Sequence, residues 1–340
     1  MSGVVSGAVS SAVSAAVSAA PGLLQVRVAR KQAVAEGISS FEFVAAAGGA
    51  LPAFEAGAHI DVHLPGGLVR QYSLCNAPGP TQHYQVAVLR EPQSRGGSQA
   101  MHEQVQEGSV LAISAPRNSF PLAAGAHSHL LMAGGIGVTP MLAMAEALHA
   151  AGQAFELHYA TRSRARTAFA DALAAAPYAA QVHLHLDDGA PEQRLNLPAL
   201  LARPPAGRHL YVCGPQGYIE AVLGTARAQG WAEAQLHCEY FGAAPVVVAA
   251  GEQPFEVELS SSGRVVQVPV GVPITQALAD AGVFVATSCE QGICGTCLTR
   301  VLSGTPEHRD QYLTPEEQAA NDVCLPCCAR SRSARLVLEL

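Results

Sequence analysis

The strongest chemical signal in the sequence is a group of cysteines near the C-terminal end. Cys289, Cys294 and Cys297 follow one another with the spacing C-x4-C-x2-C. This is the ligand spacing of a 2Fe-2S cluster site, in which three thiolates on one loop are joined by a fourth, distant cysteine. A zinc site would show paired C-x2-C knuckles, which the longer first gap fits poorly. The pattern therefore predicts an iron-sulfur cluster at these three residues.

The fourth ligand must come from a second group of cysteines, Cys324, Cys327 and Cys328, and the spacing alone leaves all three open. Gly292 and Gly295 lie within the first group, where they would let backbone N–H groups approach the sulfides. These two groups hold six of the nine cysteines in the chain. In a cytoplasmic protein such crowding points to metal binding before disulfides.

A run of residues at 70–74, RQYSL, could bind a flavin. An arginine can form charge-assisted bonds to a phosphate, a tyrosine ring can lie on the isoalloxazine, and a serine hydroxyl with nearby backbone groups can reach the flavin N5. The candidate residues are Arg70, Tyr72, Ser73 and Leu74. Taken alone, this run is more typical of an ordinary alternating strand.

A second motif strengthens the flavin interpretation. Gly96, Gly97 and Ser98 follow Arg95 and precede a helix-like stretch at residues 99–106. Exposed N–H groups at the start of a helix bind phosphate, and two glycines allow a close approach. With both motifs present in this order, a flavin site becomes the favoured interpretation.

Two glycine-containing turns indicate a nucleotide site. The turn at residues 132–140, MAGGIGVTP, lies between a strand-like and a helix-like run. It departs from G-x-G-x-x-G because Pro140 replaces the last glycine, and we expect this proline at the first helical position, where the missing N–H costs nothing. The second turn, CGP at residues 213–215, ends a later strand-like run. The candidate nucleotide-binding residues are Gly135, Gly137, Thr139, Pro140, Cys213, Gly214 and Pro215.

These motifs together resemble those of the phthalate dioxygenase reductase and vanillate demethylase reductase family. RQYSL is similar to the family's Arg-x-Tyr-Ser flavin motif, GGIGVTP and CGP to its pyridine-nucleotide domain, and the ending LPCCARSRSARLVLEL to its ferredoxin domain. The resemblance covers residues from about 23 to 340. It includes the order of the domains, since this family places the ferredoxin domain last.

The resemblance implies roles for single residues. It makes Cys327 the fourth cluster ligand, because the first cysteine of the family's Cys-x-x-Arg pattern is the ligand, and it leaves Cys328 as a buried apolar residue. The glycine-rich turn would bind pyrophosphate, and the CGP turn would border the nicotinamide. Phe241 would lie beside the flavin, with core packing as the alternative. The family implies FMN rather than FAD, and NADH as electron donor.

The choice of nucleotide depends on a cluster of arginines after the second strand-like run of the nucleotide region. Arg162, Arg164 and Arg166 could bind the 2′-phosphate of NADPH. An ordinary surface cluster explains them equally well. NADH is therefore expected, and NADPH stays possible.

The pattern of short runs predicts a multidomain β and α/β protein. Residues 1–21 are a Ser, Ala and Val repeat, which we interpret as a low-complexity leader. Alternating runs over 22–124 predict an antiparallel FMN-binding β-barrel, and alternating strand-like and helix-like runs over 125–242 predict a doubly wound NAD-binding α/β domain. A linker is expected at 243–253, followed at 254–340 by a 2Fe-2S ferredoxin domain, which the resemblance implies to be a β-grasp fold.

Composition excludes several classes of protein. With 49% hydrophobic residues, the chain of 340 residues can bury a core and is not disordered throughout. The formal charge is −7 and there is no basic tract, so a nucleic-acid partner is not expected. The sequence has no uninterrupted apolar run of about 18 residues and no positively charged N-terminal start, so we expect no membrane span and a cytoplasmic location.

The combined motifs predict a reductase component of a two-component oxygenase or demethylase. A hydride donor supplies two electrons at once and an iron-sulfur cluster accepts them singly, so a flavin must lie between them. We expect the nicotinamide to bind in a cleft bounded by Tyr72, Thr139 and Cys213, and electrons to leave through the cluster to a terminal, Rieske-type oxygenase. The alternatives are a redox-sensing or electron-storage protein with little turnover, and a reductase for a non-Rieske acceptor.

Overall fold

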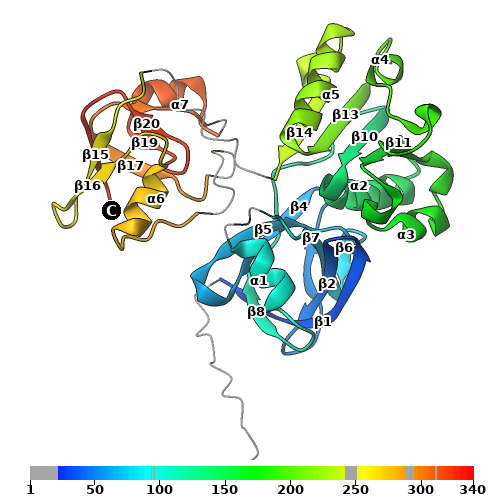
Figure 1. Ribbon diagram of the computed structural model, residues 1–340, viewed down its shortest axis with the longest axis horizontal. Coiled ribbons are helices and arrows are strands. Elements are labelled where there is room, and N and C mark those ends of the chain that lie inside the picture. Colours follow the sequence, from blue (N-terminus) through cyan, green and yellow to red (C-terminus); the bar gives the residue numbers. More distant parts are fainter. Residues whose placement is uncertain are drawn as a thin grey trace, which may run out of the picture.

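The computed structural model describes residues 22–92, 94, 96–241, 251–287, 292, 295–310 and 312–340. This part of the chain forms three units in sequence order: an antiparallel barrel, a parallel sheet between helices, and a small mixed-sheet unit (Figure 1). The predicted leader at 1–21 and residues 243–250 of the predicted linker lie outside the described residues.

The first unit is built on a sheet in the order β5-β4-β8-β1-β2-β7, with β9 paired to β4. All of these pairs are antiparallel, as alternating runs with one buried face predict. The separate pair β3 and β6 was not predicted, because each strand is too short to show a period. The strands are β1 Leu24–Ala35, β2 Ile38–Ala45, β3 Leu51–Phe54, β4 Ala58–His63, β5 Val69–Ser73, β6 Gly79–Thr81, β7 His83–Leu89, β8 Val110–Ile113 and β9 Arg117–Asn118.

One short helix, α1 (Gly97–Glu103), packs on the barrel, with Met101 in the barrel core. Lys31, the only lysine in the chain, lies at the C-terminal end of this helix. Its Nζ donates hydrogen bonds to the carbonyls of His102 at 2.6 Å and Val105 at 2.7 Å. A cation that bonds the last carbonyls of a helix stabilises that end, so α1 is held in place on β1.

The second unit is a parallel sheet in the order β12-β11-β10-β13-β14. Helices α2 and α3 pack on one face and α4 and α5 on the other, which confirms the doubly wound prediction. The strands are β10 Ser128–Gly134, β11 Ala154–Thr161, β12 Val182–Leu186, β13 Arg208–Gly214 and β14 Leu236–Tyr240. The helices are α2 Val138–Ala150, α3 Ala170–Ala175, α4 Leu197–Leu200 and α5 Gln216–Ala228.

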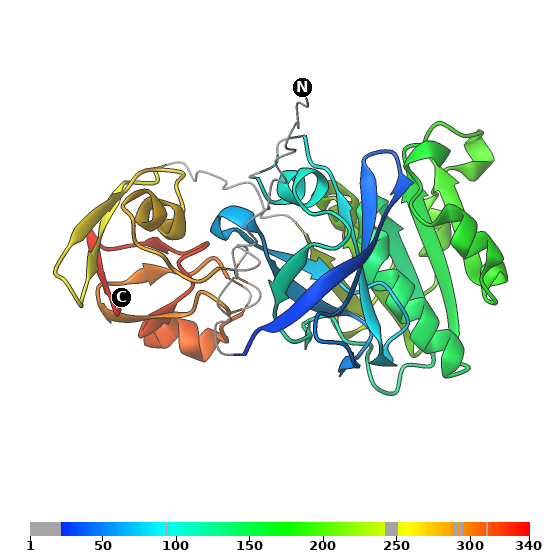
Figure 2. The same cartoon turned by 90° about the horizontal axis from the view of Figure 1, so that it is seen from below.

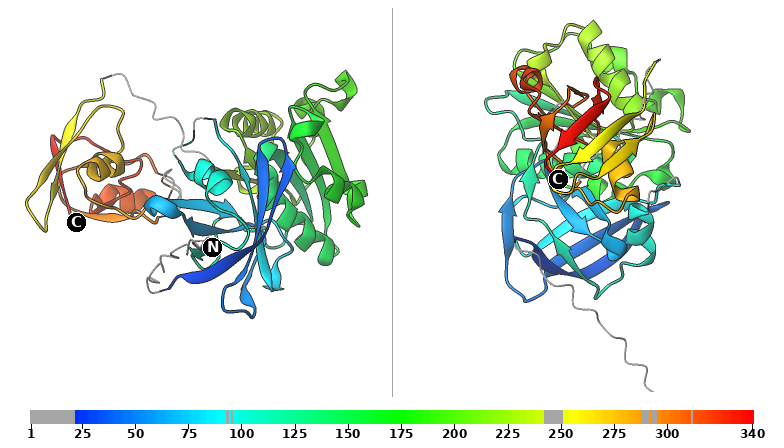
Figure 3. Two further views of the ribbon diagram at one scale, coloured as in Figure 1. Left: turned by 60° about the horizontal axis from the view of Figure 1, so that its bottom comes forward. Right: turned by 90° about the vertical axis from the view of Figure 1, so that its left-hand side faces the viewer.

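The barrel and the parallel sheet share an apolar core. Ala56, Cys75 and Phe120 from the barrel side pack in the same cluster as Leu142 of α2 and Phe155 of β11. Figures 2 and 3 show the two units in close contact from other sides. The shared core fixes the end of β5 close to the carboxyl ends of the parallel strands.

The third unit contains a sheet in the order β16-β15-β21-β17-β19 and a small pair, β18 and β20. Strands β15 and β21 are parallel and the other pairs are antiparallel. The strands are β15 Phe255–Leu259, β16 Val265–Val268, β17 Thr299–Ser303, β18 Pro306–Glu307, β19 Val323–Cys324, β20 Arg330–Ser331 and β21 Arg335–Leu338; the helices are α6 Ile274–Asp280 and α7 Pro315–Ala320.

Short 3-10 helices lie at Pro65–Gly67, Gly135–Gly137, Arg164–Arg166, Ala179–Gln181, Pro191–Gln193 and Glu233–Gln235. Among the described residues, no helix has both the length and the apolar character needed to cross a membrane.

Candidate functional site

The RQYSL run forms β5 and the residue after it. Tyr72 is half-buried against the barrel core, and burial raises the pKa of its hydroxyl. Leu74 is fully buried in the same core and donates its backbone N–H to the carbonyl of Ala58 at 2.9 Å. The Leu74 side chain therefore packs in the core, which leaves only its backbone carbonyl for a ligand. Among the described residues, the amide Nε2 of the intervening Gln71 is buried without a hydrogen-bond partner.

The two predicted flavin motifs are in direct contact. A Cβ on Gly97 would lie 2.5 Å from Cγ and Nε of Arg70, so only glycine leaves room for this arginine at the start of α1. The Ser98 hydroxyl accepts a bond from the N–H of Glu91 at 3.1 Å and donates one to Ser94 at 3.0 Å. A guanidinium beside free N–H groups of a helix start is suited to a phosphate.

The glycine-rich turn lies against the end of β13. A Cβ on Gly137 would collide with the carbonyl of Cys213, so the two predicted nucleotide motifs meet through backbone contact. The helix starts at Val138, which corrects the predicted place of Pro140: it is the third helical residue, not the first. The proline is tolerated there because the first four N–H groups of a helix lack intrahelical partners. Thr139 is buried and its hydroxyl donates to the carbonyl of Ile136 at 3.1 Å.

Gly214 and Pro215 connect the end of β13 to α5. Tyr218, in the first turn of α5, packs on Gly134, where an added Cβ would lie 2.8 Å from the tyrosine ring. Its hydroxyl is buried and has no hydrogen-bond partner within the described ranges. Sequence reasoning missed Tyr218, because nothing marks it except its distance of three residues from Pro215.

The end of β5 and the end of β14 are joined by a hydrogen bond from Ser73 to Glu239. The Ser73 hydroxyl lies 3.3 Å from Oε2 of Glu239, although the two residues are 166 positions apart. Burial raises the pKa of Glu239 to about 8, and the bond from Ser73 opposes this rise. Glu239 pairs across the strands with Cys213, whose burial and proximity to this carboxyl raise its own pKa. Sequence reasoning missed Glu239, because nothing in the sequence before Phe241 marks this carboxylate.

Phe241 directly follows β14 and is the last described residue before 251. Its side chain is 41% exposed, which is unusual for a large apolar residue and disfavours the alternative of core packing.

The three arginines after β11 differ in their surroundings. Arg164 pairs with Asp171 at 2.8 Å and Arg166 with Glu36 of the barrel at 2.9 Å, both on the surface. Arg162 is exposed. Two of the three guanidiniums thus already have acidic partners, which favours the surface cluster over a 2′-phosphate site.

Two of the four predicted cluster ligands, Cys289 and Cys294, lie outside the described residues. The other two, Cys297 and Cys327, are buried in one small core. In the described ranges no group of three metal-ligating side chains occurs.

The surroundings of these cysteines fit a cluster. Gly292 and Gly295 have φ of +72° and +71°, the left-handed region that favours glycine. A Cβ on Gly292 would lie 2.5 Å from Sγ of Cys328, and one on Gly295 would collide with the ring of Tyr312. Side chains at these two positions would collide with Cys328, Asp310 and Tyr312, so glycine is required for the loop to pack here. A loop without side chains is also what N–H groups directed at sulfides require.

Comparison with known proteins agrees with this geometry. The family model for the 2Fe-2S iron-sulfur cluster binding domain matches residues 257–332. A second model, for the N-terminal domain of dimethylamine monooxygenase subunit DmmA-like proteins, matches residues 114–236.

Full-length relatives are similar over almost the whole chain. Vanillate O-demethylase oxidoreductase from Pseudomonas sp. strain HR199 is 54% identical, over 94% of this chain and 100% of its own. Phthalate dioxygenase reductase from Burkholderia cepacia is 39% identical, over 94% and 98%. A solved structure of phthalate dioxygenase reductase, 39% identical, superposes with a TM-score of 0.74 over 94% of this chain and 98% of that one.

These matches confirm the predicted fold class, the flavin, nicotinamide and 2Fe-2S cofactors, and an NAD(P)H-dependent flavin iron-sulfur oxidoreductase. The chain therefore belongs to the family of oxygenase reductase components that includes vanillate O-demethylase oxidoreductase and phthalate dioxygenase reductase.

Proposed function

We propose that this protein oxidises NADH and supplies single electrons to a terminal, Rieske-type oxygenase or demethylase. FMN would accept the hydride and the 2Fe-2S cluster would release electrons one at a time. The observation that carries the proposal is the Ser73–Glu239 bond, because it joins the strand of the flavin motif to the strand that ends beside Cys213. Hydride transfer requires the nicotinamide and the flavin to lie close together, and the contact between these two strands would bring their sites together.

We assign the proposed binding residues to three cofactors. We assign the FMN phosphate to Arg70 and the start of α1, the isoalloxazine to the end of β5 with Phe241, the nucleotide to the two turns, and the cluster to four cysteines. The flavin residues are Arg70, Tyr72, Ser73, Leu74, Gly96, Gly97, Ser98 and Phe241. The nucleotide residues are Gly135, Gly137, Thr139, Pro140, Cys213, Gly214 and Pro215. The cluster ligands are Cys289, Cys294, Cys297 and Cys327. The proposed domains are 22–124, 125–242 and 254–340.

The chain's own side chains would position the cofactors and exclude water from the site. Arg70 supplies a fixed positive charge at the phosphate, and buried Thr139 and Cys213 exclude water where the turns meet. The raised pKa of Glu239 leaves a proton on this carboxyl at neutral pH, so no negative charge faces the ring system there. The ion pairs of Arg164 and Arg166 favour NADH over NADPH.

The partner and location are part of the same proposal. Relatives include vanillate O-demethylase oxidoreductase and a tert-butanol monooxygenase reductase subunit, which are components of oxygenase systems. A separate terminal oxygenase therefore accepts the electrons. The use of cysteines for metal and not for disulfides is consistent with the cytoplasm.

An anaerobic NADH titration of the purified protein, with cofactor extraction and iron analysis, tests this function. We expect FMN, about two irons per chain, and full bleaching near about 1.5 NADH, which corresponds to three electrons. Steady NADH consumption with cytochrome c as acceptor is expected. Reduction that stops after one stoichiometric bleaching, with no turnover, would instead support a sensor or storage protein.

A further inference from the structure

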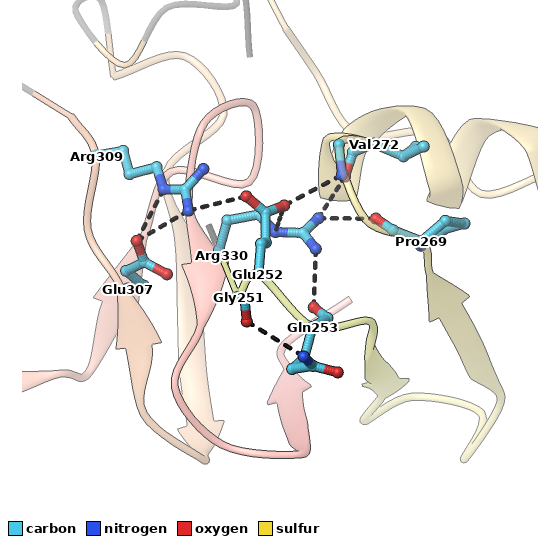
Figure 4. A network of polar contacts seen from close by, with 9 residues as sticks. Gly251, Glu252, Gln253, Pro269, Val272, Glu307, Arg309 and Arg330 are labelled. Atoms are coloured by element: carbon cyan, nitrogen blue, oxygen red, sulfur yellow. Dashed lines mark hydrogen bonds and ion pairs between the residues drawn. The ribbon is translucent and has the colours of Figure 1, made fainter. Parts of the chain in front are cut away.

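The segment that enters the third unit carries a buried carboxylate, Glu252, whose side chain is 4% exposed. Its Oε1 lies 2.9 Å from Nε of Arg330 and accepts the N–H of Gly271 at 3.1 Å. Its Oε2 lies 3.2 Å from Nη2 of Arg309, which also bonds Glu307 at 2.9 Å (Figure 4). Two guanidiniums thus meet two carboxylates, so the network is close to neutral. It is buried at Glu252 and Arg330 and reaches the partly exposed Arg309 and Glu307.

Arg330 extends this network into the backbone. It is 2% exposed, and its Nη1 donates to the carbonyls of Pro269 at 3.0 Å and Val272 at 2.7 Å, while Nη2 donates to that of Gln253 at 3.1 Å. The guanidinium also lies over the ring of Phe255, 4.7 Å from its centroid. Because the five donors of arginine form a rigid fork, these contacts fix the direction as well as the position of the segment 251–253.

Both arginines belong to segments that bear on the cluster site. Arg330 follows Cys327 by three residues. Arg309 precedes Asp310, whose Cα and Cβ lie 2.8 Å from the place of a Cβ on Gly292. Glu252 therefore connects the segment 251–253 to the segment that carries Asp310 and to the segment that carries Cys327.

A buried ion-pair network is weak evidence for stability, because its desolvation offsets much of the attraction, but it can specify one arrangement. We propose that Glu252 is a positioning residue: it fixes the segment 251–253, through which the chain enters the third unit, to the cluster-bearing segments and so sets the position of the cluster for electron transfer from the flavin. This inference rests on the proposed function. In each event the flavin would lose one electron and the cluster would gain it, and over the two events the proton that arrived with the hydride would leave the flavin for solvent.

The test compares holoprotein carrying E252Q or E252D with wild type. The control is E256Q, because Glu256 pairs with Arg335 at 2.6 Å on the exposed side of the same unit. Anaerobic stopped-flow mixing with NADH gives separate rates of flavin and cluster reduction, and amide hydrogen exchange reports on Gly271, whose N–H donates to Glu252. We expect E252Q to keep its iron and its flavin reduction rate, to slow cluster reduction by about 10- to 100-fold, and to exchange faster at Gly271. E252D should fall between E252Q and wild type, and E256Q should match wild type.

A cluster reduction rate in E252Q equal to wild type, with full iron content, would overturn the inference. So would a loss that only follows missing iron, with an unchanged rate per intact cluster, since this is the signature of a purely structural role. If E252Q loses its cluster, E252D is measured instead, because it keeps the negative charge. A slowed cluster reduction rate in E252D would support the inference, and a wild-type rate per intact cluster would overturn it. A wild-type protein whose flavin is reduced while its cluster stays oxidised would refute the proposed function itself, and the inference with it.

Discussion

The carboxyl of Glu239 should make the stability of the barrel and parallel sheet depend on pH. Burial raises its pKa to about 8 in the folded protein, against the ordinary value of 4.5. Between these values the folded state binds more protons than the unfolded state, so the free energy of unfolding falls as pH rises through the window. From pH 5 to pH 8 this single group lowers it by up to about 3.5 kcal/mol, an upper limit because the residue is only half-buried.

The substitution E239Q tests this prediction because glutamine imitates the protonated acid and cannot titrate. Holoprotein is heated at several values from pH 5 to pH 8 while flavin fluorescence reports its release. We expect equal midpoints for wild type and E239Q near pH 5, and a midpoint for E239Q that is higher by up to about 10 °C at pH 8.

The control is E192Q, which removes an exposed carboxylate from the same unit. Its midpoint should follow that of wild type at every pH, because Glu192 is exposed and its replacement disturbs no buried group. The difference between variant and wild type cancels the titration of all other groups. Parallel curves for wild type and E239Q from pH 5 to pH 8 would refute the reasoning, because they would show that the carboxyl is ionised in the folded protein.

Three further predictions concern single positions. C327S should abolish the visible and EPR signals of the cluster while C328S keeps them, and the reverse result would make Cys328 the ligand. G97A should weaken FMN binding by about tenfold, because the new Cβ displaces Arg70; an unchanged FMN dissociation constant would show that Arg70 can move away without loss. His158 stacks on two neighbouring histidines at 4.6 and 5.3 Å, and burial first, then their charge, lowers its pKa to about 4. The pKa of this histidine is higher in the unfolded chain, so the free energy of unfolding should fall by up to about 3 kcal/mol as pH drops from 6.5 to 4. In H158N the midpoint of thermal unfolding should therefore decrease less over this pH range than in wild type.

The parts of the fold that repeat a local period could be predicted from the sequence. Strands such as β2 and β7 largely alternate buried with half-buried residues, and α2 follows a strand and a glycine turn, so each can be recognised within about ten residues of sequence. Strands β3 and β6 could not be predicted, because strands this short show no hydrophobic alternation and form only by pairing with each other.

The position of Pro140 shows a similar limit. The proline marks a helix start correctly, but the first turn begins two residues earlier, after the 3-10 turn at Gly135–Gly137. Any of the first four helical positions accepts a residue without an N–H. A proline therefore places the start of a helix within a few residues but does not identify the first helical residue.

The site residues that sequence reasoning missed share one physical property. Glu239 matters because Ser73, 166 residues away, lies against it, and Glu252 matters because Arg330 and Arg309 surround it. A carboxylate on the surface and one buried between distant segments are the same letter in a sequence. Whether the group is protonated, ion-paired or solvated depends on its burial together with the charges and hydrogen bonds around it. Cysteine and glycine motifs can be recognised in the sequence because their chemistry requires that residue type. The roles of the two carboxylates can be recognised only in the folded structure. Glu239 contacts a residue of the barrel, and Glu252 contacts two distant segments of the third unit. The residues that we propose to couple the cofactor sites are therefore found from tertiary contacts, whereas the residues that we propose to bind the cofactors are found from local spacing.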